Sequence, residues 1–283
     1  MKIAITAEST IDLPKELLEK YDIKTVPFTV ILGDKEGRDG EITSDIIFDY
    51  VKETGILPKT TAINEYEYTE FFEEMLKEVD AIVHLSLSSG VSSSCSHAIS
   101  AAEKLKNVYV IDSLSLSTGI ALQAIYAKQL ADAGKTPSEI VELVKARQDS
   151  LQVSFIVERL DYLHKGGRCS GFKLLGANVL KIRPRIVLKN GKMGNDKTYR
   201  GAMPFAVKKY CQECLNEFDN PDKSIVFLTY TSATPEMRDA AYNTLVEAGF
   251  ENIYETRAGA TITSHCGEDT LGILYYNDGG VKA

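Results

Sequence analysis

The sequence predicts an α/β protein built from two domains, a first one around a parallel sheet and a second one of mixed α+β architecture. The chain has 283 residues, which is long for a single hydrophobic core. In its first half short apolar strands alternate with helical segments, an order typical of parallel crossovers. In its second half the rhythm changes and a hairpin signal is present. We therefore expect residues 1–151 to form the first domain and residues 152–283 the second.

The first half reads as four apolar strands and six helices. Pro14 sits early in the first turn of one helix, and Thr43 caps another in which Ile46, Ile47 and Tyr50 recur at helical spacing. Ligands of parallel sheets bind beyond the carboxyl ends of the strands, where polar loops are expected here at residues 8–10, 86–94 and 112–117. The strands are expected at residues 2–6, 26–32, 81–87 and 108–112, and the helices at 12–20, from 43 onward, and at 66–77, 95–105, 118–133 and 137–149. Residues 34–40 are expected as a polar hairpin or loop, and the surroundings of Pro58 as a loop.

The second half is expected to combine a hairpin with three helices and four further strands. Asn190 and Gly191 form a hairpin turn signal between residues 183–188 and 192–193. The remaining strands are expected at residues 153–157, 224–229, 253–257 and 271–276, and the helices at 160–165, 202–218 and 235–248. This order predicts a mixed α+β domain.

Composition and charge exclude several classes of protein. Apolar residues make up 44% and charged residues 25%, as in ordinary globular proteins, and the net charge of −8 argues against a general nucleic-acid binder. No apolar run approaches the roughly 20 residues of a membrane span. The apolar start of the chain is too short for a signal peptide, so the five cysteines are expected to be free thiols in the cytoplasm.

The turn Lys165-Gly166-Gly167-Arg168 indicates an anionic ligand or partner. Paired glycines allow positive φ and close approach of another group, and two cations flank them. The alternative is an ordinary helix end, with glycine after a basic last turn.

Six of the nine residues from Ser86 to Ser94 are serines, between a predicted strand and a predicted helix. Capping that helix needs only one hydroxyl, so the loop favours a site for a polar head group at the helix start. The segment Gly90-Val91-Ser92-Ser93-Ser94 lacks the second glycine of a hydrolase nucleophile elbow.

Other candidate groups are fewer. His265, expected in a loop near Ser264 and Gly267, is the best candidate for a functional imidazole, and the four histidines are too scattered for a zinc site. Cys211 and Cys214 form a CxxC inside a helical pattern, which favours packing over redox chemistry.

In their order along nearly the whole chain, these pieces resemble the DegV family of bacterial fatty-acid-binding proteins. The segment 7–14 resembles the family's opening Asp-Ser-(Ser/Thr)-x-Asp-Leu-Pro, and the serine loop resembles its Ser-Ser-x-Leu-Ser-Gly-Thr. The most specific match is Leu163–Arg168 together with Leu180–Pro184. Further matches are Asp39–Ile42, Leu57–Thr61, Ile111–Ser113, Ser117–Gly119, Tyr199–Gly201 and the segment around His265.

The chain departs from the family pattern at three places. It has Thr60-Thr61-Ala62-Ile63 where Thr-Ser-Gln-Pro is usual, and Ser92-Ser93-Ser94 where Ser-Gly-Thr is usual. Near the end it has Cys266-Gly267-Glu268-Asp269 in place of Gly-Pro-Gly, which changes the expected shape of the last loop.

The resemblance implies a two-domain DegV-like fold with a lipid site between the domains. It implies a non-enzymatic carrier that presents the fatty-acid carboxylate to a separate kinase, which makes an acyl phosphate, with no cofactor or metal. Thr61 and Ser93 would receive the carboxylate with Arg200 and His265 nearby, and Thr60 and Ser92 are the alternatives one residue away. Lys165 and Arg168 would face the partner or its phosphate.

Two rival functions stay open at this point. A serine-dependent hydrolase or transferase would use Ser92 or Ser93 with His265, against which the missing elbow glycine argues. A binder of another anionic ligand, without a kinase partner, would use the same residues.

Overall fold

The structure is a computed structural model and describes residues 1–168 and 181–281. Its first sheet has four parallel strands in the order β2-β1-β6-β7. These strands are β1 (Ile3–Glu8), β2 (Ile23–Val26), β6 (Ala81–Ser86) and β7 (Val108–Asp112). Because all four run the same way, the three predicted polar loops do emerge at one edge of the sheet: Glu8 accepts a hydrogen bond from Leu87 N–H, and Ser113 N–H donates to Ser86.

The second sheet has six strands in the order β10-β9-β8-β13-β11-β12, and only β11 and β12 run parallel. The strands are β8 (Leu151–Ile156), β9 (Ile182–Lys189), β10 (Lys192–Arg200), β11 (Val226–Tyr230), β12 (Ile253–Arg257) and β13 (Leu271–Tyr276). The predicted Asn-Gly hairpin joins β9 to β10, with positive φ at both turn residues. The α/β class with a parallel and a mixed sheet is confirmed. The chain enters the second sheet at Leu151, while the two domain limits themselves stay a prediction.

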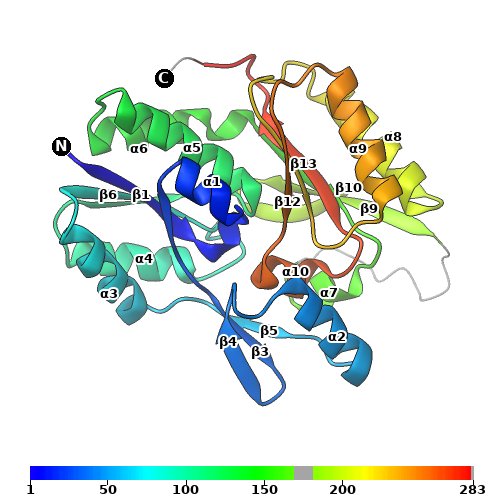
Figure 1. The fold of residues 1–283 in the computed structure, drawn as a ribbon, viewed down its shortest axis with the longest axis horizontal. Coiled ribbons are helices and arrows are strands. Elements are labelled where there is room, and N and C mark those ends of the chain that lie inside the picture. The colour runs from blue at the N-terminus through cyan, green and yellow to red at the C-terminus, as the bar shows by residue number, and fades with distance from the viewer. Residues whose placement is uncertain (169–180, 282–283) are drawn as a thin grey trace.

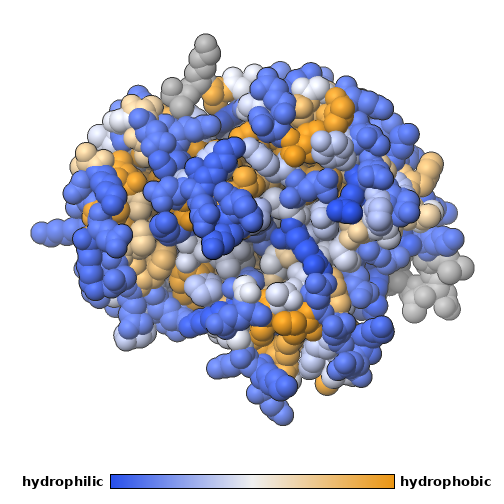
Figure 2. All heavy atoms as spheres, viewed as in Figure 1, coloured by the Kyte–Doolittle hydropathy of each residue, from blue (hydrophilic) through white to orange (hydrophobic). Residues whose placement is uncertain are grey.

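A third, small antiparallel sheet consists of β3 (Thr29–Leu32), β4 (Lys35–Arg38) and β5 (Lys59–Thr61). It lies at the bottom of Figure 1, beside α2 (Ser44–Thr54). Figure 2 shows hydrophilic residues over most of the same face of the molecule and apolar ones gathered over this small sheet.

Helices cover the sheets and fill the space between them. The helix α5 (Thr118–Asp132) is buried along most of its length and contacts β1 and β6 of the first sheet and β8 and β13 of the second. The helices α8 (Met203–Glu217) and α9 (Pro235–Glu247) lie side by side against the second sheet (Figure 1). The other helices are α1 (Lys15–Lys20), α3 (Glu65–Leu76), α4 (Ser94–Glu103), α6 (Pro137–Arg147), α7 (Asp161–Lys165) and α10 (Ala260–Cys266).

One hydrophobic cluster extends across both large sheets. It includes Ile5 and Val83 of the first sheet and Phe155 and Leu274 of the second. The sheets therefore bury their facing sides against each other and α5, and a site between them lies inside a shared core.

The predicted strand 26–32 is wrong because it spans two strands of different sheets. Val26 ends β2 and Thr29 begins β3, with Pro27 and Phe28 between them. Proline has no N–H for a ladder and fixes φ, which favours a change of direction. The N–H of Phe28 instead donates to Ser9 Oγ at 3.1 Å.

Two segments expected as loops are regular. Thr60 and Thr61 belong to the short strand β5, which pairs with β3. The segment around His265 is the helix α10, and its N-cap, Gly259, has no side chain to mark the start. Asp39, 221 residues away in sequence from Ala260, accepts its N–H at 2.8 Å, so the local sequence carries no capping signal.

Candidate functional site

Two adjoining cavities lie between the two large sheets, and together they are called the channel below. Leu116, Ile262 and Cys266 line both cavities and therefore mark their junction. One cavity is apolar and lies against the second sheet; the other carries the polar groups and reaches the serine loop. The channel thus has an apolar end and a polar end.

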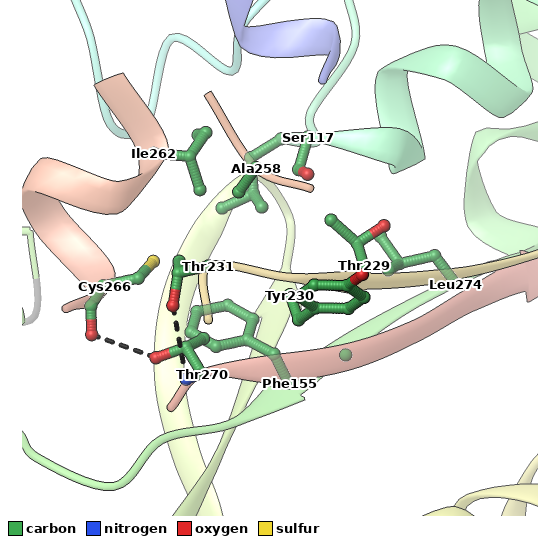
Figure 3. A pocket seen from close by; sticks show the side chains of 12 residues that line it. Ser117, Phe155, Thr229, Tyr230, Thr231, Ala258, Ile262, Cys266, Thr270 and Leu274 are labelled. Atoms are coloured by element: carbon green, nitrogen blue, oxygen red, sulfur yellow. Dashed lines mark hydrogen bonds between the residues drawn. The ribbon is translucent and has the colours of Figure 1, made fainter. Parts of the chain in front are cut away.

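The apolar end lies among β8, β11 and β13 (Figure 3). Phe155 and Leu274 face it from the sheet, and Gly272 adds no side chain. Threonines also line it, but their hydroxyls are used elsewhere: Thr231 Oγ1 donates to Gly267 O at 2.5 Å, and Thr270 Oγ1 donates to Cys266 O at 3.0 Å. Since these threonine hydroxyls are already hydrogen bonded, this end offers hydrocarbon a surface that is almost free of polar atoms.

The polar end is formed by groups from four parts of the chain that are distant in sequence. Thr60 comes from β5, Ser92 from the serine loop, Arg168 from the end of the Lys-Gly-Gly-Arg turn, and Thr261 and His265 from α10. Thr60 Oγ1 and His265 Nε2 are 2.8 Å apart and hydrogen bonded. The predicted imidazole and a predicted threonine therefore meet at this end of the channel.

Burial and, secondly, the charge of Arg168 lower the pKa of His265 to about 4. The imidazole is therefore neutral at pH 7. Its Nδ1 is buried without a hydrogen-bond partner among the described residues, close to Gly166, where a Cβ would lie only 2.6 Å from it. A neutral imidazole with a vacant nitrogen can offer one hydrogen bond to a further group.

Arg168 is placed at the polar end rather than only at the outer surface. Its guanidinium donates to Gly166 O at 2.6 Å and to Val91 O at 3.4 Å. It also borders two open depressions, one lined by the serine loop and Lys192, the other by Lys59 and Lys165. Arg168 is therefore a cation shared by the channel and the surface around its mouth.

The structure separates the paired alternatives of the sequence analysis. Thr60 lines the channel, whereas Thr61, next along the strand, is exposed. Ser92 lines the channel and also accepts the N–H of Ser94, whereas Ser93 lies in the outer depression. Among the described residues, the channel lining places Thr60 and Ser92 inward and leaves Thr61 and Ser93 outside it.

The two remaining candidates lie apart from the channel. Arg200 is exposed at the last position of β10 and is not part of the lining in the described residues. Lys165 is exposed and lines the outer depression beside Arg168. The cation at the head of the channel is thus Arg168, for which the sequence analysis predicts a place facing the partner.

Sequence reasoning missed Thr261. Its side chain is 3% exposed, it lines the polar end, and its hydroxyl has no hydrogen-bond partner among the described residues. A buried hydroxyl without a partner is costly, so this group is available to bond a ligand oxygen. No signal in the sequence marks it, because the helix that turns it inward is capped from elsewhere in the chain.

The geometry does not favour the serine-enzyme alternative. His265 Nε2 bonds Thr60, and no described carboxylate or serine is hydrogen bonded to the imidazole. Cys211 and Cys214 lie buried in α8, where burial raises the pKa of Cys214 to about 11 and that of Cys211 well above its ordinary value. These thiols are packing residues at neutral pH.

In the described part of the chain, no group of three or more His, Cys, Asp or Glu side chains is arranged to hold a metal ion. Over the same residues, no helix combines the length and hydropathy needed to cross a membrane.

The lowered pKa of His265 predicts a pH-dependent stability difference. The unfolded chain protonates this imidazole near pH 6.5 and the folded chain only near pH 4, so falling pH favours unfolding across that window. From pH 7 to pH 5, the free energy of unfolding should fall by about 1 to 2 kcal/mol more in the native protein than in His265→Gln. Urea unfolding at both pH values measures this, and equal losses in the two proteins would contradict it.

Comparison with known proteins gives consistent matches over almost the whole chain. A family model described as "Uncharacterised protein, DegV family" matches residues 2–278. The fatty acid-binding protein of Thermotoga maritima is 29% identical over 286 residues, covering 96% of each chain. A fatty-acid-binding DegV family protein from Thermus thermophilus superposes with a TM-score of 0.87 at 27% identity and covers 98% of this chain and 99% of that one. A stearic acid-binding protein from Eubacterium ventriosum gives a TM-score of 0.82 at 25% identity, covering 97% and 98%.

Proposed function

The chain belongs to the DegV family, whose family model spans residues 2–278, and from this membership we propose that it binds a long-chain fatty acid and presents the carboxylate to a fatty-acid kinase. It acts as a lipid-binding, substrate-presenting subunit and not as the catalyst. The observation that carries the proposal is the channel, which is apolar between the sheets and ends on Thr60, Thr261, His265 and Arg168. Relatives described as fatty-acid-binding proteins share both fold and family.

The apolar end supplies the affinity for the tail. Burial of each methylene is worth about 0.8 kcal/mol, so a chain of some sixteen carbons offers on the order of 12 kcal/mol before costs. Loss of translational, rotational and chain freedom removes several kcal/mol of that. The remainder is enough for tight retention, with Phe155 and Leu274 among the residues that the tail would contact.

The polar end supplies recognition of the acid. A carboxylate cannot be buried unpaired, and it accepts hydrogen bonds only. Among the described residues, the Thr261 hydroxyl and Nδ1 of neutral His265 have no hydrogen-bond partner, and together with the Arg168 guanidinium they can donate to it. Ser92 lines the same end and can donate its hydroxyl, while Thr60 donates to His265 Nε2 and so leaves Nδ1 as the donor; the two are favoured over Thr61 and Ser93.

The mouth of the channel suits presentation to a second enzyme. Ser93 and Lys192 line an open depression that meets the channel at Ser92 and Arg168, so an approaching active site would reach the head group from there. The kinase would transfer the γ-phosphoryl group of ATP to a carboxylate oxygen, forming the acyl-phosphate bond as the bond to ADP breaks. Lys165 and Arg168 would attract the phosphate or the kinase surface.

The test combines binding with phosphoryl transfer. Delipidated protein should bind palmitate or oleate tightly and bind methyl palmitate at least tenfold more weakly, because the ester offers no anionic head. Loaded protein, mixed with a bacterial fatty-acid kinase and ATP, should yield acyl phosphate that hydroxylamine traps as the hydroxamate. Binding without hydroxamate would leave the carrier role and remove the presenting role; no binding of either acid would remove both.

A further inference from the structure

The helix α10 carries four residues of the channel lining, yet its start is held by two carboxylates from the first half of the chain. Asp39 accepts the N–H groups of Ala260 at 2.8 Å and Thr261 at 3.2 Å, and Asp12 accepts that of Gly259 at 2.8 Å. These bonds satisfy donors that a helix start leaves free. The position of α10 is therefore set by residues outside its own neighbourhood.

The two carboxylates leave no spare room around Gly259. Asp12 is 5% and Asp39 8% exposed. A Cβ on Gly259 would lie 2.9 Å from Asp39 Oδ1 and 3.2 Å from Asp12 Oδ1, which is closer than ordinary contact. The backbone φ of Gly259 is −68°, so only this crowding, and no backbone strain, opposes a side chain here.

Asp12 also reaches the apolar end of the channel. Its side chain shares a short hydrogen bond with that of Ser117, which lines the apolar cavity beside Leu116. Asp39 is in turn held by Ser9 Oγ at 3.0 Å. One buried pair thus fixes the helix that forms the head of the channel and the loop that forms its tail.

We propose that Asp12 and Asp39 are positioning residues for fatty-acid binding: they hold α10 so that Thr261 and His265 reach the carboxylate while Ser117 keeps the tail cavity in shape. This inference rests on the proposed function, because it assigns the pair to the same site. It predicts that disturbing the pair weakens the ligand without touching any residue of the lining.

A change of ligand affinity with pH would distinguish a positioning role of Asp12 and Asp39 from a role in packing alone. Burial, together with the charge of Asp39, raises the pKa of Asp12 to about 8, against the hydrogen bonds from Ser117 and Gly259. Arg257, two residues before Gly259, is paired with Asp45 at the surface, and His265 at the far end of α10 is neutral. Asp12 therefore keeps its proton at pH 7 and releases it as the pH rises through about 8.

A bound tail changes this proton equilibrium. Hydrocarbon in the cavity beside Ser117 would make the surroundings of Asp12 less polar and raise its pKa further, so the loaded protein should keep the proton to a higher pH than the empty one. Affinity should therefore fall as the pH rises above 8, by no more than tenfold per pH unit. Asp12→Asn keeps the shape, tolerates the left-handed φ of 54° and cannot release a proton, so its affinity should stay level.

The experiment measures the dissociation constant of cis-parinaric acid at pH 7.0, 8.0, 9.0 and 9.5 in four proteins. Binding by the native protein should weaken above pH 8, whereas binding by Asp12→Asn should not. Gly259→Ala, which changes no charge, should weaken binding about tenfold at pH 7. Gly194→Ala, where a Cβ meets nothing within 4 Å, is the matched control and should bind like the native protein.

Thermal unfolding of each variant accompanies the binding curves. If Gly259→Ala does not unfold cooperatively, Ser9→Ala replaces it, since it removes the hydrogen bond to Asp39 and Ser9 lies outside the lining. Parallel pH profiles for the native protein and Asp12→Asn, or Gly259→Ala binding like Gly194→Ala, would overturn the positioning role. Absence of binding by the native protein at pH 7 would instead refute the proposed function.

Discussion

Replacing Ile262 with tryptophan is expected to weaken fatty-acid binding at least 100-fold, the largest effect that the channel predicts. Ile262 lines both cavities where they join, beside Leu116 and Cys266. An indole at the junction would fill the path of the tail and separate the two ends. A 100-fold loss corresponds to about 2.7 kcal/mol of binding free energy.

The matched control for this blockade is Ile262→Val. It removes one methylene from the same site, leaves the junction open and should bind within about threefold of the native protein. Titration with cis-parinaric acid measures both variants, and a thermal melt shows whether the indole is accommodated, since overpacking costs about 1 to 3 kcal/mol where no space exists. A folded tryptophan variant that still retains the ligand would mean that the tail does not pass this junction.

Replacing Arg168 with alanine is expected to weaken binding of the acid about 10- to 100-fold. Arg168 borders the polar end of the channel, and a hydrogen bond to a charged group contributes about 1.5 to 3 kcal/mol. The methyl ester of the same acid should lose little, because its head carries no charge. Isothermal titration with acid and ester separates this head-group effect from a general loss of structure.

Arg200→Ala is the matched control for the arginine, and Thr61→Val is the control for Thr60→Val. Arg200 and Thr61 are exposed and lie outside the lining, so both controls should bind the acid like the native protein. Thr60→Val, by contrast, should weaken binding of the acid. The reverse pattern, with Arg200 and Thr61 sensitive and Arg168 and Thr60 indifferent, would place the carboxylate outside the channel.

Most regular elements were predictable from the sequence because their own residues carry the signal. The helix α3 is marked by its capping box from Asn64 to Glu67, and the β9–β10 hairpin by Asn190 and Gly191. The helix α10 was not predictable, since the carboxylate that caps its first turn belongs to Asp39. Tertiary contacts determine where α10 begins, and such contacts leave no pattern in the local sequence.

The types of residue that form the candidate site were predictable from the sequence, but the choice between neighbouring positions was not. The sequence indicated hydroxyls, an imidazole and cations around an anion. Which of two neighbouring hydroxyls points inward depends on the alternation of side chains along β5 and on the turn before α4. Both segments are expected as loops from the sequence, and a loop has no regular alternation from which the inward residue could be predicted. Thr261 and the inward role of Arg168 emerge only when α7 and α10 come together at the head of the channel.

Native mass spectrometry of protein purified without detergent tests the central claim most directly. The channel predicts one long-chain fatty acid per protein, retained in the folded state, released on denaturation and identified by extraction. Empty protein that also fails to take up added palmitate or oleate would contradict the claim, because an apolar channel with a matched polar end should not remain empty beside its ligand.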